Sequence, residues 1–215
     1  MIIGGKDLLN GKRFDKGGYI LTYDYDKWSF IDPKEAQKKL NLPRNPRDYT
    51  SIAVTTDDSN DEIVYASSMG DGVIQYKNGT PVQSYNEKNA FKETAGGYGS
   101  GYCYIDGLAF DKNGNLWMTS SEVNHAVLVL DKAGAWHRLD IEQLRGVYTI
   151  NDILITSTND KWIYVPRNTP KLVMIPNSES LDEVSSYEFT TLIDTDGKEL
   201  TPSNYTCVAE DKDGY

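Results

Sequence analysis

The sequence is poor in the side chains on which most enzymes and metal sites depend. It has two histidines and two cysteines among 215 residues. His125 and His137 stand outside any metal-ligand or nucleophile spacing. No Gly-x-Ser-x-Gly sequence occurs, so nothing indicates a serine nucleophile on a strand-to-helix turn. We therefore expect a non-catalytic chain without a metal or a cofactor.

Long apolar runs and an excess of basic residues are also missing. No stretch approaches the roughly 20 apolar residues that span a bilayer. The formal charge is −10, from 32 acidic and 22 basic side chains. A chain without a Lys/Arg stripe is a poor ligand for phosphate backbones and anionic lipids. We expect no nucleic-acid partner and no membrane insertion, which leaves sugars, cations and proteins as partners.

The first residues lack the features of a secretory signal. Residues 1–6, Met-Ile-Ile-Gly-Gly-Lys, have neither the basic and apolar regions nor the cleavage site. Either the protein is cytoplasmic or its natural chain begins elsewhere. Cys103 and Cys207 lie far apart in no metal or redox spacing, so we expect free thiols, which leave the compartment open.

What the sequence does contain is an internal repeat. Residues 22–31, 76–85 and 130–139 superpose, each joining an apolar run through a polar turn to a short second strand. That second strand opens with Trp28, Val82 and Trp136, at equal intervals of about 54 residues. A repeat of this length indicates a protein built from copies of one supersecondary unit.

A second series of β-type runs interleaves with the first, at residues 51–54, 107–110, 152–155 and 206–209. The better preserved runs lead through a polar turn into another strand, and Asn113-Gly114 is a strong hairpin signal. Each repeat therefore predicts four antiparallel strands, the blade of a β-propeller. The predicted fold class is all-β, a propeller fragment of about three and a half blades in an incomplete ring.

We predict one partial propeller over residues 1–215, with short helical turns at 33–40 and 140–144. Residues 207–215 repeat residues 108–115 but lack the strand that follows, which indicates a piece of a longer repeat protein. Exposed blade faces and edges then predict self-association or an incomplete arc. The predicted blades are residues 1–40 (partial), 49–90, 104–145, 150–200 and 205–215 (the start of the next).

A tyrosine precedes the inner strand of each unit, and polar residues stand beside it. In a propeller the chain crosses at this point from one blade to the next, near the mouth of the central channel. The rings could stack on sugar faces while the polar groups bond hydroxyls, or the rings could seal the gap between blades. The candidate ligand-binding residues are Tyr49, Tyr104, Asp106, Tyr148, Asn151, Asp152 and Tyr205.

The tryptophans and the Asp-Gly turns favour structural roles. We expect core positions for Trp117 and Trp162 between blades, and for Trp28 and Trp136 on outer blade faces. The Asp111 turn lacks the closing Glu of a calcium loop, so its carboxylate is expected to accept backbone N–H bonds.

The glycine-rich segment 95–102 has no Gly-Lys-Ser/Thr sequence and precedes no predicted helix. It therefore differs from a phosphate-binding loop. We expect a mobile loop between blades, whose role in binding stays open.

Two resemblances to known families follow from these motifs. Residues 107–119 and 208–215 resemble the two-component regulator propeller repeat, apolar-x-apolar-x-Asp-x-x-Gly-x-Leu/Ile-Trp. Residues 51–67 depart from it by lacking the Asp-x-x-Gly turn. The wider context is similar to the PorZ-type propeller protein of the Bacteroidetes type IX secretion system, in residues 11–14, 23–31, 65–72, 85–89 and 200–204.

The second resemblance implies an exported protein of the periplasm or cell surface, with two propellers and a C-terminal β-sandwich. Such a protein would serve as a binding and assembly platform in an attachment complex, contacting lipopolysaccharide or protein partners. The first resemblance implies an alternative, the ligand-sensing propeller of a hybrid two-component system that binds an oligosaccharide. A propeller enzyme would need a metal or His/Glu cluster at the channel, which the sequence lacks.

Overall fold

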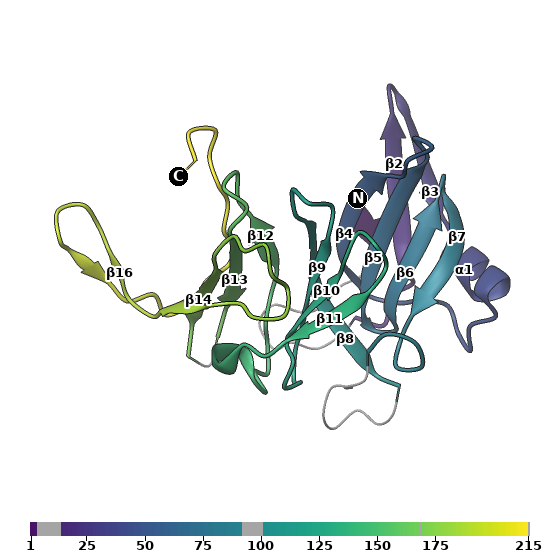
Figure 1. Ribbon diagram of the computed structural model, residues 1–215. Coiled ribbons are helices and arrows are strands. Elements are labelled where there is room, and N and C mark those ends of the chain that lie inside the picture. The colour runs from purple at the N-terminus through teal and green to yellow at the C-terminus, as the bar shows by residue number, and fades with distance from the viewer. Residues whose placement is uncertain (4–13, 92–100, 168, 215) are drawn as a thin grey trace. The chain divides into compact units, whose positions relative to one another are not determined.

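The computed structural model describes residues 1–3, 14–91, 101–167 and 169–214 (Figure 1). Strands dominate these residues, as the sequence predicts. The chain divides into two compact units, Met1–Leu108 and Ala109–Tyr215, which are described in turn.

The first sheet of unit 1 has the order β1-β2-β3, from β1 (Ile2–Ile3), β2 (Tyr19–Asp24) and β3 (Lys27–Ile31). Helix α1 (Pro33–Leu40) follows and confirms the predicted helical turns. Asp32 caps it, because its carboxylate accepts a hydrogen bond from the Lys34 N–H at 2.9 Å. Asn41, with φ 50°, ends it in the left-handed region.

The second sheet of unit 1 contains the antiparallel strands β4 (Tyr49–Thr56), β5 (Glu62–Gly70), β6 (Gly72–Lys77) and β7 (Thr80–Tyr85). The turn between β5 and β6 depends on Gly72, which has φ 79°. A Cβ there would lie 2.1 Å from the Tyr85 carbonyl oxygen, so only glycine fits. The core beneath this sheet consists of Ile20, Ala36, Tyr49, Val64, Ala66, Ile74 and Tyr76.

Strand β8 (Cys103–Phe110) pairs with β5 through Met69 and Tyr104 and ends at the start of unit 2. It continues into β9 (Leu116–Ser120), β10 (Val127–Leu130) and β11 (Trp136–Leu139), in the order β8-β9-β10-β11. The one-turn 3-10 helix η1 (Glu142–Leu144) follows, where a helical turn was predicted.

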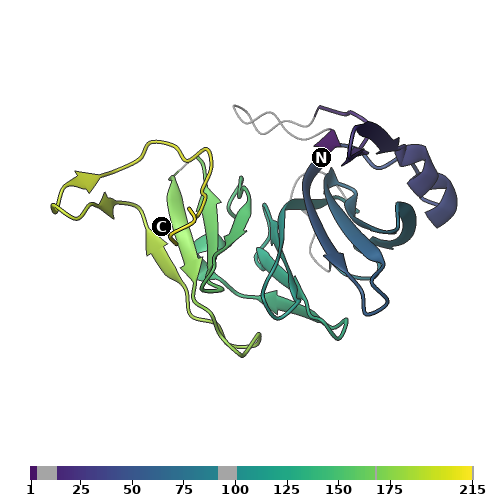
Figure 2. The same cartoon turned by 90° about the horizontal axis from the view of Figure 1, so that it is seen from above.

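The next sheet of unit 2 is β12 (Ile153–Ile155), β13 (Lys161–Val165), β14 (Lys171–Ile175) and β15 (Tyr187–Phe189), in that order (Figure 2). A separate hairpin joins β16 (Leu192–Ile193) to β17 (Glu199–Leu200). The repeated four-stranded antiparallel sheets confirm the all-β class and the blade-like repeat. The exact blade limits stay a prediction.

One turn recurs between strands in both units. In the Asp111 turn, the carboxylate oxygen Oδ1 accepts the N–H groups of Asn113 at 2.9 Å and Asn115 at 2.8 Å. Asp194 accepts two N–H groups in the same pattern, at 3.0 and 2.8 Å. The fourth residue has positive φ, for example 83° at Gly114. The predicted structural role of the aspartate is confirmed.

The same turn occurs where the sequence motif fails. Asp57 accepts the N–H groups of Ser59 at 2.9 Å and Asp61 at 3.0 Å, and Asn60 takes the fourth position with φ 63°. Asparagine tolerates this conformation better than other non-glycine residues. The turn in residues 51–67 is therefore present without its glycine.

Asp111 also connects its turn to the core of unit 2. Its second oxygen, Oδ2, accepts the Trp117 indole N–H at 2.9 Å, and Trp117 is 1% exposed. The ammonium of buried Lys161 lies 4.6 Å from the centroid of that indole, a cation–π contact. Burial lowers the pKa of Lys161, and the charges of Asp111 and Asp160 oppose that shift.

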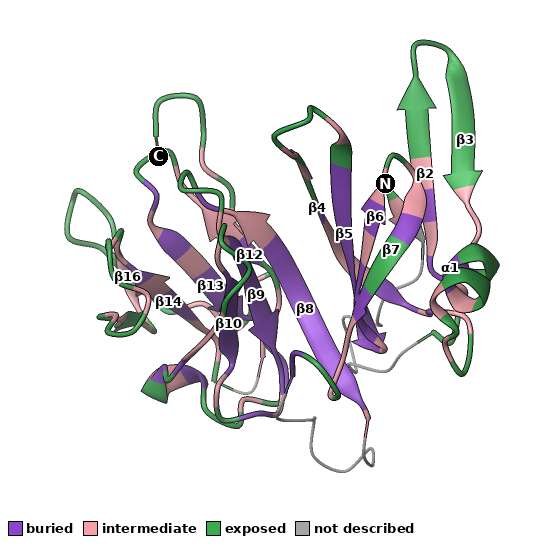
Figure 3. Cartoon of the chain, turned by 45° about the vertical axis from the view of Figure 1, so that its right-hand side comes forward, coloured by how far each residue is buried: buried purple, intermediate pink, exposed green. Residues whose placement is uncertain are grey.

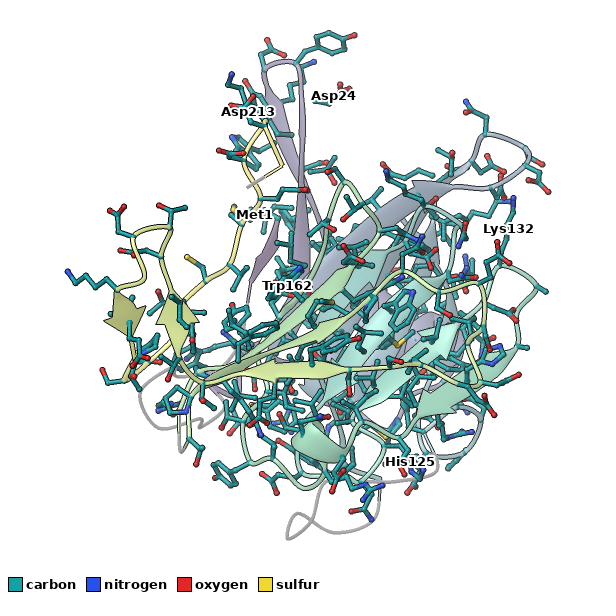
Figure 4. All side chains as sticks on the ribbon, turned by 60° about the vertical axis from the view of Figure 1, so that its left-hand side comes forward. Met1, Asp24, His125, Lys132, Trp162 and Asp213 are labelled. Carbon is teal, nitrogen blue, oxygen red and sulfur yellow. The ribbon has the colours of Figure 1, made fainter. Side chains whose placement is uncertain are left out.

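The core prediction holds for Trp117 but is wrong for Trp28. The far end of the β2–β3 hairpin is exposed (Figure 3). Trp28 in this hairpin is 60% exposed, and its ring centroid lies 4.9 Å from that of Tyr23. Among the described residues, β1 pairs only with Tyr19 and Ile20 of β2, so the far end of the hairpin extends beyond its paired neighbour. Trp136 and Trp162 are partly buried, and Trp162, labelled in Figure 4, stacks on Phe189 at 5.5 Å.

Replacing Asp111 by alanine tests how far the turn stabilises the fold. Asp111→Ala removes two backbone contacts and leaves the buried Trp117 indole N–H unpaired, so we expect a loss of about 3 kcal/mol in unfolding free energy. Asp194→Ala, the matched change in an exposed turn, should cost about 1 kcal/mol. Urea denaturation of both variants measures the difference, and equal losses would contradict the coupling between turn and core.

Candidate functional site

Tyr49, the first predicted site residue, begins β4 and lies in the core of unit 1. It is 1% exposed, and its hydroxyl is 2.6 Å from the Tyr76 hydroxyl. The Gly18 backbone lies against its ring, because a Cβ there would come within 2.9 Å of three ring atoms. Burial, and then the neighbouring Tyr76, raise the pKa of Tyr49. This environment favours the packing interpretation of the ring.

Tyr104 and Asp106, on β8, are also interior residues of unit 1, at 2% and 3% exposure. Tyr104 clusters with Met69 and meets the Tyr102 ring edge-on at 6.3 Å. Strand β8 is tied to β4 because the Thr50 hydroxyl donates to the Ile105 carbonyl at 2.6 Å. Neither predicted residue presents its side chain to solvent in unit 1.

In unit 2, Asn151 and Asp152 lie in a polar cluster around Tyr164. The Asn151 amide donates to the Tyr164 hydroxyl at 2.9 Å, and that hydroxyl donates to the Thr206 carbonyl at 3.3 Å. Burial, and then the charge of Asp152, raise the pKa of Tyr164. The sequence did not indicate Tyr164 as a site residue, because it reads as an inward position of a buried strand.

Tyr205, near the C-terminal end of unit 2, is partly buried. Its backbone N–H donates to the Pro166 carbonyl at 3.4 Å. Its hydroxyl is enclosed and has no hydrogen-bond partner among the described residues. Burial raises the pKa of Tyr205.

Tyr148 differs from the other tyrosines because it is half exposed, at 50%. It lies on the wall of a cavity of about 360 Å³. The other lining residues are Arg145, Gly146, Val147, Thr149, Val165, Arg167, Thr169 and Lys171. We call this site the basic cavity, because it holds three cationic side chains. The sequence does not predict this cluster of cations, because Arg145 precedes β12 whereas Arg167 and Lys171 follow β13.

A second cavity, of about 350 Å³, lies in unit 1 between the segment around Arg44 and the turn after β7. Arg44 donates to the Asp71 carboxylate on its wall, with Nη2 2.7 Å from Oδ1. Gly101 and Tyr102, the end of the glycine-rich segment, line it. Residues 95–100 of that segment lie outside the described residues, so its predicted role stays open.

The histidines and cysteines of the described residues do not form a cluster that could bind a metal ion. Within the described ranges, no group of three or more His, Cys, Asp or Glu side chains could hold a metal ion. His137 pairs with Asp131 at 3.0 Å, which raises the pKa of its imidazole, while His125, labelled in Figure 4, is partly buried. Cys103 is a free thiol, and its burial raises its pKa to about 12. Cys207 is free and exposed.

No helix in the described part of the chain combines the length and apolar character needed to cross a bilayer. No protein-family model matches the sequence, and no curated protein matches it either. Comparison with solved structures does find similar folds.

One such structure is PorZ of Porphyromonas gingivalis, an essential bacterial surface component of the type-IX secretion system. It matches with a TM-score of 0.77 and 20% identity over 93% of this chain. Another is an extracellular domain assigned to a hybrid two-component system of B. thetaiotaomicron, with a TM-score of 0.57 and 17% identity over 99% of this chain. The chain covers 27% and 25% of the two neighbours' own lengths.

These likenesses establish a shared fold with the two kinds of protein to which the sequence motifs pointed. Both are proteins or domains outside the cytoplasm. At identities of 20% and 17%, the similarity establishes the fold alone, and the function depends on the residues of the site.

Two conservative substitutions separate packing tyrosines from exposed ones. Tyr49→Phe leaves the buried Tyr76 hydroxyl without its partner, so we expect a loss of about 1 kcal/mol in unfolding free energy. Tyr148→Phe removes a solvated hydroxyl from a half-exposed ring and should change stability by less than about 0.5 kcal/mol. Thermal and urea denaturation measure both variants. If the Tyr49→Phe protein is as stable as the wild type, the hydrogen bond between the Tyr49 and Tyr76 hydroxyls does not stabilise the core.

Proposed function

We propose that this chain is a propeller segment of an exported surface protein and serves as a non-catalytic binding and assembly platform. In this proposal it belongs to a PorZ-like attachment complex of a type IX secretion system. Its partners are lipopolysaccharide or other proteins of that complex. The full-length protein would act in the periplasm or at the cell surface.

The observation that carries the proposal is the fold likeness to PorZ, with a TM-score of 0.77 over 93% of the chain. The sequence supports the same proposal, because residues 11–14, 23–31, 65–72, 85–89 and 200–204 resemble the PorZ-type propeller protein. The described residues supply half-exposed aromatic and cationic side chains at a cavity, which suit binding more than chemistry.

An alternative is a ligand-sensing propeller of a hybrid two-component system that binds an oligosaccharide. The observation in its favour is the match to such an extracellular domain over 99% of the chain, although the TM-score is lower, at 0.57. The two proposals differ in ligand, because a sensor would recognise a free oligosaccharide while a secretion component would recognise lipopolysaccharide.

Binding to immobilised lipopolysaccharide tests the proposal. We expect the purified chain to bind lipopolysaccharide from a Bacteroidetes species in biolayer interferometry. Tyr148→Ala should weaken that binding about fivefold, because a lost stacking contact costs about 1 kcal/mol. Tyr187→Ala is the matched control, since Tyr187 is 53% exposed and Tyr148 50% exposed.

Absence of lipopolysaccharide binding, together with binding to soluble oligosaccharides, would favour the sensor. Equal losses in the Tyr148 and Tyr187 variants would remove Tyr148 from the binding surface.

Self-association of the chain is part of the same proposal, because incomplete propellers leave blade faces uncovered. We expect small-angle scattering to give a mass above that of one chain, or an open arc. A closed, compact monomer would contradict it.

A further inference from the structure

The basic cavity of unit 2 gathers cations in a chain that is otherwise strongly acidic. The chain carries a formal charge of −10, yet Arg145, Arg167 and Lys171 line one cavity. No aspartate or glutamate is among its lining residues. Asp140 and Glu188, which lie outside the lining, offset the charges of Arg145 and Lys171 and leave the charge of Arg167 uncompensated by an ion pair among the described residues.

Two of the three cations form ion pairs with carboxylates. Arg145 donates to both Asp140 oxygens at 2.6 Å, and Lys171 to a Glu188 oxygen at 2.8 Å. Arg167 has no ion-pair partner among the described residues. Its guanidinium therefore keeps its charge and its hydrogen-bonding capacity for a ligand, while Arg145 and Lys171 keep N–H donors beyond those used in their ion pairs.

The fold brings these side chains together from two separate segments. Arg167 and Thr169 belong to the connection between β13 and β14, which the pairing of Val165 with Lys171 closes. Arg145 and Tyr148 belong to the segment between η1 and β12, where the Gly146 N–H donates to the Val123 carbonyl at 2.9 Å.

Thr169 adds a second sign that the cavity is specialised. Its φ is 86°, in a region that β-branched residues rarely adopt. Such backbone strain persists only where the surrounding structure imposes it, and it clusters at ligand-binding sites. Here it occurs on the cavity wall, two residues after Arg167.

We propose that the basic cavity binds a phosphate monoester carried on a small sugar. A phosphoryl group offers three acceptor oxygens, so the Arg167 guanidinium can bind two of them at once while a further N–H donor of Arg145 or Lys171 binds the third. The half-exposed Tyr148 ring offers a face for the sugar. At about 360 Å³ the cavity is at the small end of ligand pockets, which suits one sugar unit.

This inference deepens the proposed function by naming a site and a ligand charge, and it rests on the chain being a glycan-binding platform. Its test does not use lipopolysaccharide, so the two can fail separately. If the chain binds lipopolysaccharide but does not bind glucose 1-phosphate, the inference fails and the proposed function stands.

Titration calorimetry with four probes tests the chemistry: inorganic phosphate, glucose 1-phosphate, glucose and glucuronate. We expect glucose 1-phosphate to bind most tightly, inorganic phosphate more weakly, and glucose not measurably. The affinity should fall with added salt, because the contact is ionic. Binding of phosphate and glucose 1-phosphate with equal affinity would overturn the sugar part, and glucuronate binding without phosphate binding would overturn the phosphoryl part.

Arg167→Gln tests the residue assignment. It should weaken glucose 1-phosphate binding by about tenfold or more, because it removes a charged hydrogen-bond donor. Lys198→Gln is the control, since it removes one positive charge from an exposed turn far along the chain and should leave the affinity unchanged.

Both variants should keep the wild-type circular dichroism spectrum and melting temperature, because Arg167 makes no ion pair among the described residues. If folded Arg167→Gln binds as the wild type does, or if both variants lose affinity equally, the assignment is overturned.

Discussion

The fold depends on an aspartate carboxylate that closes a hairpin turn by accepting backbone N–H groups. Asp57, Asp111 and Asp194 do this in both units, and each orders a turn whose fourth residue has positive φ. In unit 2 the turns are also linked to one another. The Lys112 N–H donates to the Asn159 side chain at 2.9 Å, and the Ser157 N–H donates to Glu210 at 2.6 Å. Local turn chemistry thus also aligns successive sheets.

Much of the fold could be predicted from the sequence because its determinants are local. Alternating apolar residues and Asp-x-x-Gly turns act within about ten residues, so the strands and hairpins could be predicted from them. The prediction failed at Trp28, because an apolar position on a strand says nothing about whether another strand covers it. The sequence predicts a polar turn at Asp57 but does not reveal that it matches the Asp111 turn, because Asn60 takes the place of the glycine in a conformation that asparagine also tolerates.

The candidate site was harder to predict, because burial and long-range pairing decide it. The tyrosine series suggested four equivalent rings, but Tyr49 and Tyr104 are interior while Tyr148 is half exposed. Arg145 and Arg167 lie far apart in sequence, and only the register of β13 and β14 closes the loop that carries Arg167 to the same cavity. No local motif marks such a cluster.

The position of Lys161 has a consequence for chemical labelling. Its ammonium is enclosed above the Trp117 ring, whereas most lysines of this chain are solvated. An acylating reagent would modify the solvated amines first and reach Lys161 only when β13 separates from that indole. Its rate of modification would therefore report how often the interior of unit 2 opens.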